Sequence, residues 1–176
     1  GVGGHLEVCQ NLLACVRESG ASVRDYVNML TFDGNSALMW AAWSGTLDTV
    51  KFLVRSKADP AVANRNGCTV AHWAASGGNI DVCKYLADTI GVDFAAPNHA
   101  GNTPLTHAVT FGRKAVVEWL PTRLTKDDEM LAFSLAQDVV QWTEGNDNKR
   151  KRVLDIFDDN SWRSDADAST DMHELA

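Results

Sequence analysis

Glycine recurs along this chain at a nearly constant interval, and a fixed period of this kind constrains the fold more than any local motif. The interval is 33 residues and then 34, from Gly34 to Gly67 to Gly101. Each glycine precedes a segment of one design, which reads NSALMWAA at 35–42, CTVAHWAA at 68–75 and NTPLTHAV at 102–109. A second set follows at the same offsets, at Gly45, Gly78 and Gly112. The chain therefore repeats one structural unit three times.

Each unit is predicted to hold two helices. The first follows a Ser or Thr that can cap it, and it carries small alanines that let neighbouring helices approach closely. The second is predicted from the apolar spacing of VKFLV at 50–54, CKYLA at 83–87 and VEWL at 117–120. The 34-residue interval contains one extra residue, which we expect to lengthen the surface loop around Ile90 and Gly91.

The third unit, GNTPLTHA at 101–108, resembles the ankyrin repeat family, whose unit carries Gly-x-Thr-Pro-Leu-His-x-Ala. The other units depart from that pattern, with Ala37 and Val70 at the usual Pro and Ala71 at the usual Leu. The resemblance implies an all-α, ankyrin-like helical solenoid. Its three repeats would span residues 31–63, 64–97 and 98–120.

The flanks lack these landmarks. Residues 1–30 keep helical apolar spacing from Leu6 to Val16, which predicts a helical N-terminal cap or a degenerate repeat. Residues 121–157 are predicted to form a two-helix C-terminal extension, and residues 158–176 an acidic tail with little to bury. The basic run at 149–152, KRKR, fits a nuclear-import signal or an anion contact, but the solvated start of a helix is the favoured interpretation.

Composition excludes several function classes. Sixteen Lys and Arg against 23 Asp and Glu give a net charge of −7, which argues against a nucleic-acid partner. The sequence contains no run of about 18 apolar residues and no secretory signal, so no membrane span is expected. Four scattered cysteines indicate a reducing intracellular compartment, the cytoplasm first, with an organelle or the nucleus as alternatives. Nothing indicates homo-oligomerisation.

The sequence carries no recognisable catalytic constellation. It has no Gly-x-Ser-x-Gly elbow, no phosphate-cradling glycine loop and no Cys-x-x-Cys pair, so we expect no catalytic residues, no metal and no cofactor. The resemblance implies that His72 is a structural histidine that hydrogen-bonds the turn. His107 stands where the other units have Trp40 and Trp73. We interpret all three residues as packing between repeats.

The resemblance also implies where a partner would bind, namely the turn tips before each first helix and the exposed concave face of that helix. Carried over position by position, these are Phe32, Asp33, Asn35, Trp43 and Ser44, then Arg65, Asn66, Cys68, Ser76 and Gly77, then His99, Ala100, Asn102, Thr110 and Phe111. Trp43 and Phe111 stand out, because a large aromatic residue on a solvent-facing surface is typical of an interface anchor.

The function predicted from these features is non-catalytic binding of a protein partner through the concave face. One alternative is a structural accessory subunit of a large multiprotein assembly, organellar assemblies included, in which neighbours bury the caps and tail. A second alternative is an enzyme, or the regulatory domain of one, whose catalytic part lies outside this chain.

Overall fold

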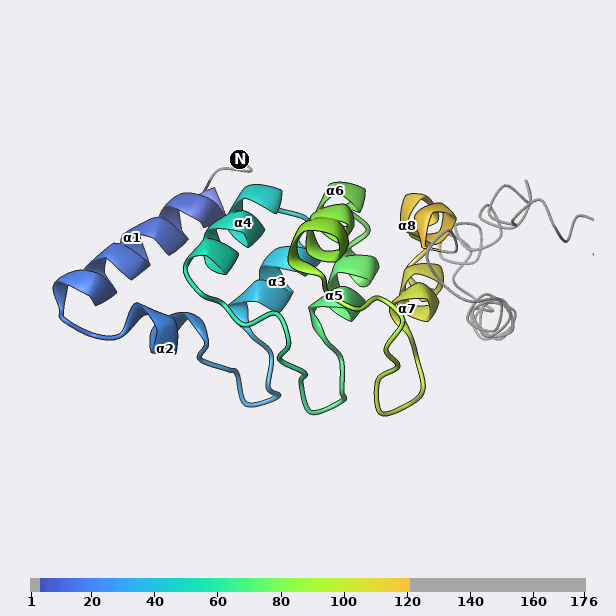
Figure 1. The fold of residues 1–176 in the computed structure, drawn as a ribbon, viewed down its shortest axis with the longest axis horizontal. Coiled ribbons are helices and arrows are strands. Elements are labelled where there is room, and N and C mark those ends of the chain that lie inside the picture. The colour runs from blue at the N-terminus through green and yellow to red at the C-terminus, as the bar shows by residue number, and fades with distance from the viewer. Residues whose placement is uncertain (1–3, 121–176) are drawn as a thin grey trace, which may run out of the picture.

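In the computed structural model, which describes residues 4–120, the helices stack in two rows (Figure 1). The outer row holds α1 (Gly4–Glu18), α4 (Leu47–Arg55), α6 (Ile80–Lys84) with its continuation η1 (Tyr85–Ile90), and α8 (Lys114–Trp119). The inner row holds α3 (Ala37–Trp43), α5 (Val70–Gly77) and α7 (Pro104–Thr110). The short α2 (Val23–Val27) follows α1. The predicted all-α solenoid of three repeated units is confirmed.

Each inner helix begins at a hydroxyl residue that follows a tight loop. Ser36 Oγ accepts a hydrogen bond from the Met39 amide, and Thr103 Oγ1 accepts one from the Thr106 amide. At α5 the Thr69 amide donates to Nδ1 of His72. These bonds satisfy amides that would otherwise lack partners in a first turn, so the repeated Ser or Thr fixes where each helix starts.

The core lies between the two rows and is continuous from repeat to repeat. The predicted alanine positions are all buried, and Ala42, Ala74, Ala75 and Ala108 are fully inaccessible. The closest approach is at Gly77, where a Cβ atom would meet the backbone carbonyl oxygens of Ala42 and Trp43. Only a residue without a side chain permits α3 and α5 to pack at this separation.

The prediction that the extra residue of the second unit lengthens a surface loop is wrong. The residue lies inside a helix. The outer helix of that unit changes to π geometry over Tyr85–Ile90. Its closing bond runs from the Val92 amide to the Leu86 carbonyl, whereas the first unit closes from Ala58 to Leu53, one residue less. A single inserted residue in an α-helix is commonly accommodated as one such wide turn, which leaves the flanking contacts in register.

Within residues 4–120, no helix is long and apolar enough to cross a bilayer. The predicted C-terminal extension at 121–157, the tail at 158–176 and the basic run at 149–152 lie outside the described residues.

Candidate functional site

The loops before the inner helices form three parallel fingers that are tied to one another. In the second and third fingers, the Oδ1 atoms of Asn64 and Asn98 accept hydrogen bonds from two amides of their own loops. The Arg65 amide donates to the carbonyl of Asp33, and the His99 amide donates to the carbonyl of Asn66, at 3.0 Å each. These bonds give the loop tips a fixed spacing.

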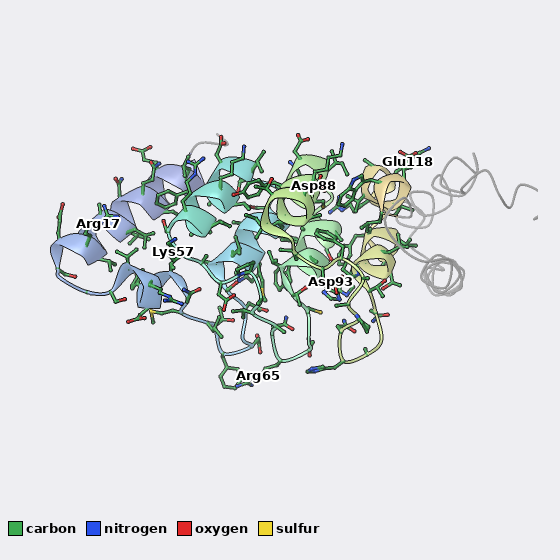
Figure 2. The ribbon with its side chains drawn as sticks, in the orientation of Figure 1. Arg17, Lys57, Arg65, Asp88, Asp93 and Glu118 are labelled. Atoms are coloured by element: carbon green, nitrogen blue, oxygen red, sulfur yellow. The ribbon has the colours of Figure 1, made fainter. Side chains whose placement is uncertain are left out.

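The tips themselves are exposed, as predicted for Phe32, Asp33, Arg65, Asn66 and His99. Phe32 is 81% exposed, and the guanidinium of Arg65 lies 3.9 Å from the centre of its ring. This cation–π contact joins the first two fingers at their ends. Figure 2 shows Arg65 at the end of its loop, away from both rows of helices.

Asn35, Asn102 and Cys68 lie lower on the fingers and are tied into the scaffold. Asn35 Oδ1 accepts a hydrogen bond from Nδ2 of Asn64, and the carbonyl of Asn102 lies 3.0 Å from Nε2 of His72. Cys68 is buried, and its sulfur accepts a hydrogen bond of 3.2 Å from the side-chain Nδ2 of Asn98. These three residues therefore hold the loops in place rather than present a free side chain.

Three indoles gather on the first two inner helices. Trp40 lies 6.0 Å from Trp43 and 4.9 Å from Trp73, measured between ring centres, and both pairs meet edge to face. We call Trp40, Trp43 and Trp73 the aromatic cluster. Trp40 is 48% exposed and Trp43 is 45% exposed, while Trp73 is more covered.

The packing interpretation of Trp40 is therefore incomplete. It does contact Trp73 across the repeat boundary, but that contact leaves about half of its surface in solvent. Of the three indoles, only Trp43 was predicted to lie on the exposed surface. The signal that could have found Trp40 is its place three residues before Trp43, which puts both on one helical face.

Ser76 is the clearest error among the predicted surface residues, because its side chain is buried. It occupies the repeat position of Trp43, yet its hydroxyl donates to the carbonyl of His72 at 2.9 Å and lies 3.1 Å from Nδ1 of His107. Polar residues become buried when their hydrogen bonds are satisfied within the protein. His72 on the same helix and His107 on the neighbouring helix α7 are these partners for Ser76.

The last predicted positions lie at the ends of the inner helices. Ser44 is exposed and donates to the carbonyl of Ala41. Thr110 is half-buried and donates to the carbonyl of Thr106. Gly77 forms the tight helix contact described above, and Ala100 is exposed at its tip. Phe111, which ends α7, remains 43% exposed, so a large aromatic side chain stands in solvent at the third repeat as well.

His72 and His107 are neighbours that are held by different hydrogen bonds. His72 accepts from the Thr69 amide through Nδ1, so its proton is on Nε2 and points to the Asn102 carbonyl. Nδ1 of His107 lies 3.1 Å from the Ser76 hydroxyl, which is also 2.9 Å from the His72 carbonyl. Burial lowers the pKa of both rings, that of His107 to about 4 with a further contribution from the charge of His72.

General-base activation requires the hydroxyl proton to point at an unprotonated ring nitrogen. The buried Ser76 hydroxyl has the His72 carbonyl as a second acceptor. Among the residues that the structure describes, no group of three or more His, Cys, Asp or Glu side chains could hold a metal ion.

The family model described as ankyrin repeats, in three copies, matches residues 38–127. The chain belongs to the ankyrin repeat family. Ankyrin repeats are generally protein–protein interaction modules, and the family is generally non-catalytic.

Two relatives share this region. The chain is 30% identical over 109 residues to a Rickettsia felis protein named as an ankyrin repeat protein, a match that covers 61% of this chain and 33% of the relative. It is 39% identical over 70 residues to the palmitoyltransferase AKR1 of Candida glabrata, which covers 40% of this chain and 9% of that protein. The chain thus spans a third or less of the curated relatives it matches.

Proposed function

We propose that this chain is a non-catalytic module that binds a protein partner through the inner face of its repeats. This face comprises the aromatic cluster, Phe111 and the loop tips at Phe32, Arg65 and His99. The observation that carries the proposal is the exposure of Trp40 and Trp43 within one contiguous group of indoles.

Exposed aromatic groups of this size favour burial against another molecule. Covering about half of two indoles removes apolar surface from water, and Trp is among the residues that contribute most to interface affinity. The rings also touch one another, so little side-chain freedom remains to be lost on binding.

The loop tips supply a polar rim around this centre. Asp33, Arg65 and His99 are exposed at tips whose backbones are hydrogen-bonded to one another. A partner with a matching surface would place an apolar patch over the indoles and polar or charged groups at the fingers. Such a centre and rim is the usual anatomy of a protein interface.

The proposal is tested by affinity purification of the tagged 176-residue chain, with co-purifying proteins quantified by mass spectrometry. Trp43→Ala and Phe111→Ala should each deplete the same specific partner. Tyr26→Ala is the matched control, because Tyr26 is 42% exposed but lies on α2, outside the inner face. Equal recovery of every specific partner by the wild type and both inner-face variants would overturn the proposal.

A further inference from the structure

The second finger carries an arginine at its tip, and it has another finger on each side. Arg65 lies between the first finger, with Phe32 and Asp33, and the third finger, with His99. Both neighbours belong to residues 4–120, so the surroundings of Arg65 are described on both sides.

The backbone of Arg65 is held by both of these fingers. Its amide donates to the Asp33 carbonyl at 3.0 Å, and its own carbonyl lies 3.1 Å from Nδ1 of His99. His99 can approach this closely because Gly67 has no side chain, since a Cβ atom there would lie 2.6 Å from Cδ2 of His99. The place of Arg65 on the surface is therefore fixed before a partner binds.

The side chain of Arg65 is positioned by one contact. Its guanidinium carbon lies 3.9 Å from the centre of the Phe32 ring, well within the range of a cation–π pair. A guanidinium that stacks on a ring by its face keeps the N–H donors at its edge for other groups. Arg65 is exposed, and it forms no ion pair with any side chain in the part of the chain from 4 to 120.

We propose that Arg65 binds a carboxylate of the protein partner, on an Asp or Glu side chain, through two parallel hydrogen bonds. Guanidinium and carboxylate match in this bidentate geometry, and such charge-assisted bonds are about twice as strong as neutral ones. An arginine that is already positioned loses little side-chain freedom on binding. The inference rests on the proposed function, to which it adds the chemistry that the partner presents at the second finger.

The neighbouring tip favours a carboxylate over a phosphate. Asp33 is exposed, and its backbone hydrogen bond places it next to Arg65. The negative charge of Asp33 repels an anion at Arg65, and it repels a phosphate more strongly, because a phosphate carries nearly two charges at neutral pH and a carboxylate carries one. The expected partner therefore presents an acidic side chain here rather than a phosphorylated one.

Two substitutions separate a bidentate contact from a loose attraction between charges. An ion pair that stays in solvent changes an affinity by less than about fivefold, whereas a bidentate pair covered by a partner changes it by at least about tenfold. Arg65→Ala should therefore reduce recovery of the partner at least about tenfold. Arg65→Lys should reduce it by at least about threefold, because an ammonium group keeps the charge but does not form both parallel bonds.

The experiment is affinity purification of the tagged 176-residue chain, with each recovered protein quantified by mass spectrometry. Arg17→Ala is the matched control, because Arg17 is an exposed arginine in the last turn of α1, away from the fingers in Figure 2. It removes the same charge and should recover the partner like the wild type. Thermal unfolding should give all these chains a Tm within a few degrees of one another, since Arg65 is exposed.

The recovered partner is then purified, and its Asp and Glu residues are replaced one at a time by Asn and Gln. One replacement should weaken binding to the wild type at least about tenfold and have no further effect on Arg65→Ala, as expected for two residues that contact each other. Absence of any such carboxylate would overturn the inference. Loss of the partner after phosphatase treatment of the extract would also overturn it, because the anion would then be a phosphate.

Recovery by Arg65→Ala or Arg65→Lys that equals that of the wild type is a third outcome that contradicts the inference. This failure differs from failure of the proposed function, which would appear as full recovery by Trp43→Ala and Phe111→Ala. A partner that requires Trp43 but not Arg65 would remove the carboxylate contact and leave the proposed function in place. A wild-type chain that recovers no specific partner would remove both.

Discussion

The indoles of Trp40 and Trp73 lie 4.9 Å apart with their planes at 64°, although they belong to different repeats. Trp73 also packs against the core, whereas Trp43 is 45% exposed. We therefore expect Trp73→Ala to lower the free energy of unfolding by roughly 2 kcal/mol, less than a fully buried Trp because Trp73 is half-buried. Trp43→Ala should cost under about 1 kcal/mol. Urea unfolding measures the free energy of unfolding of both variants. Equal losses would show that Trp73 and Trp43 do not differ in their contribution to stability.

Gly77 offers a test of the close packing between α3 and α5. Glycine to alanine in a helix normally raises stability by about 0.5–1 kcal/mol. Here the added Cβ would meet the carbonyls of Ala42 and Trp43, so Gly77→Ala should instead lower stability by about 1–3 kcal/mol. Ser44→Ala, at the same repeat position of the first unit, should change it little because Ser44 is exposed. A stabilised Gly77→Ala variant would contradict the packing described.

The π-helix accounts for the uneven period and predicts where a deletion is tolerated. Removing exposed Thr89 from η1 should convert the wide turn to ordinary α-helix and change stability by no more than about 1 kcal/mol. Removing Lys51 from α4, which has no insertion, turns buried Leu53 out of the core and should cost roughly 2–5 kcal/mol. Thermal unfolding of the two deletions distinguishes them, and similar losses would contradict this assignment.

Acid should destabilise the chain through His107. Burial holds its pKa at about 4, while the unfolded chain takes up the proton near pH 6.5. The unfolded state therefore binds more protons between these values, so stability is complete above about pH 6.5 and falls as the pH drops toward 4. Each pH unit is worth about 1.4 kcal/mol, and over about 2.5 units this gives an upper bound of about 3.5 kcal/mol.

The check is urea unfolding of the wild type and His107→Gln from pH 7 to 4.5. The glutamine variant does not titrate, so it should lose less stability over this range than the wild type. His72, whose pKa is also lowered by burial, remains in both proteins, so the difference between them reports the proton of His107 together with its coupling to His72. Parallel losses in the two proteins would show that His107 does not carry the effect.

The sequence was sufficient to predict the features that depend on local residue type. The repeated glycines, the capping hydroxyls and the alanine pairs each act within a few residues, and so the helices of residues 31–120 could be predicted. Ser76 could not be placed, because its burial depends on His107, which lies 31 residues away in the next repeat. The position of the extra residue was also inaccessible, since an insertion in the loop and one in the helix give the same period.

The candidate site was predicted at the level of surfaces rather than of individual contacts. The loop tips and Trp43 are exposed, but the exposure of Trp40 depends on how the neighbouring helices pack, and its contact with Trp73 crosses a repeat boundary. Contacts between repeats are long-range in sequence, so the pattern within one repeat does not determine them.

The central claim is that the aromatic cluster anchors a protein partner. It is tested most directly by titrating the purified partner from the affinity experiment against the wild type and Trp43→Ala by isothermal calorimetry, with the Tm of both chains measured alongside. We predict a Kd at least tenfold weaker, about 1.4 kcal/mol, with a Tm within a few degrees of the wild type. An unchanged Kd, or a loss of affinity that merely follows a large fall in Tm, would contradict the account.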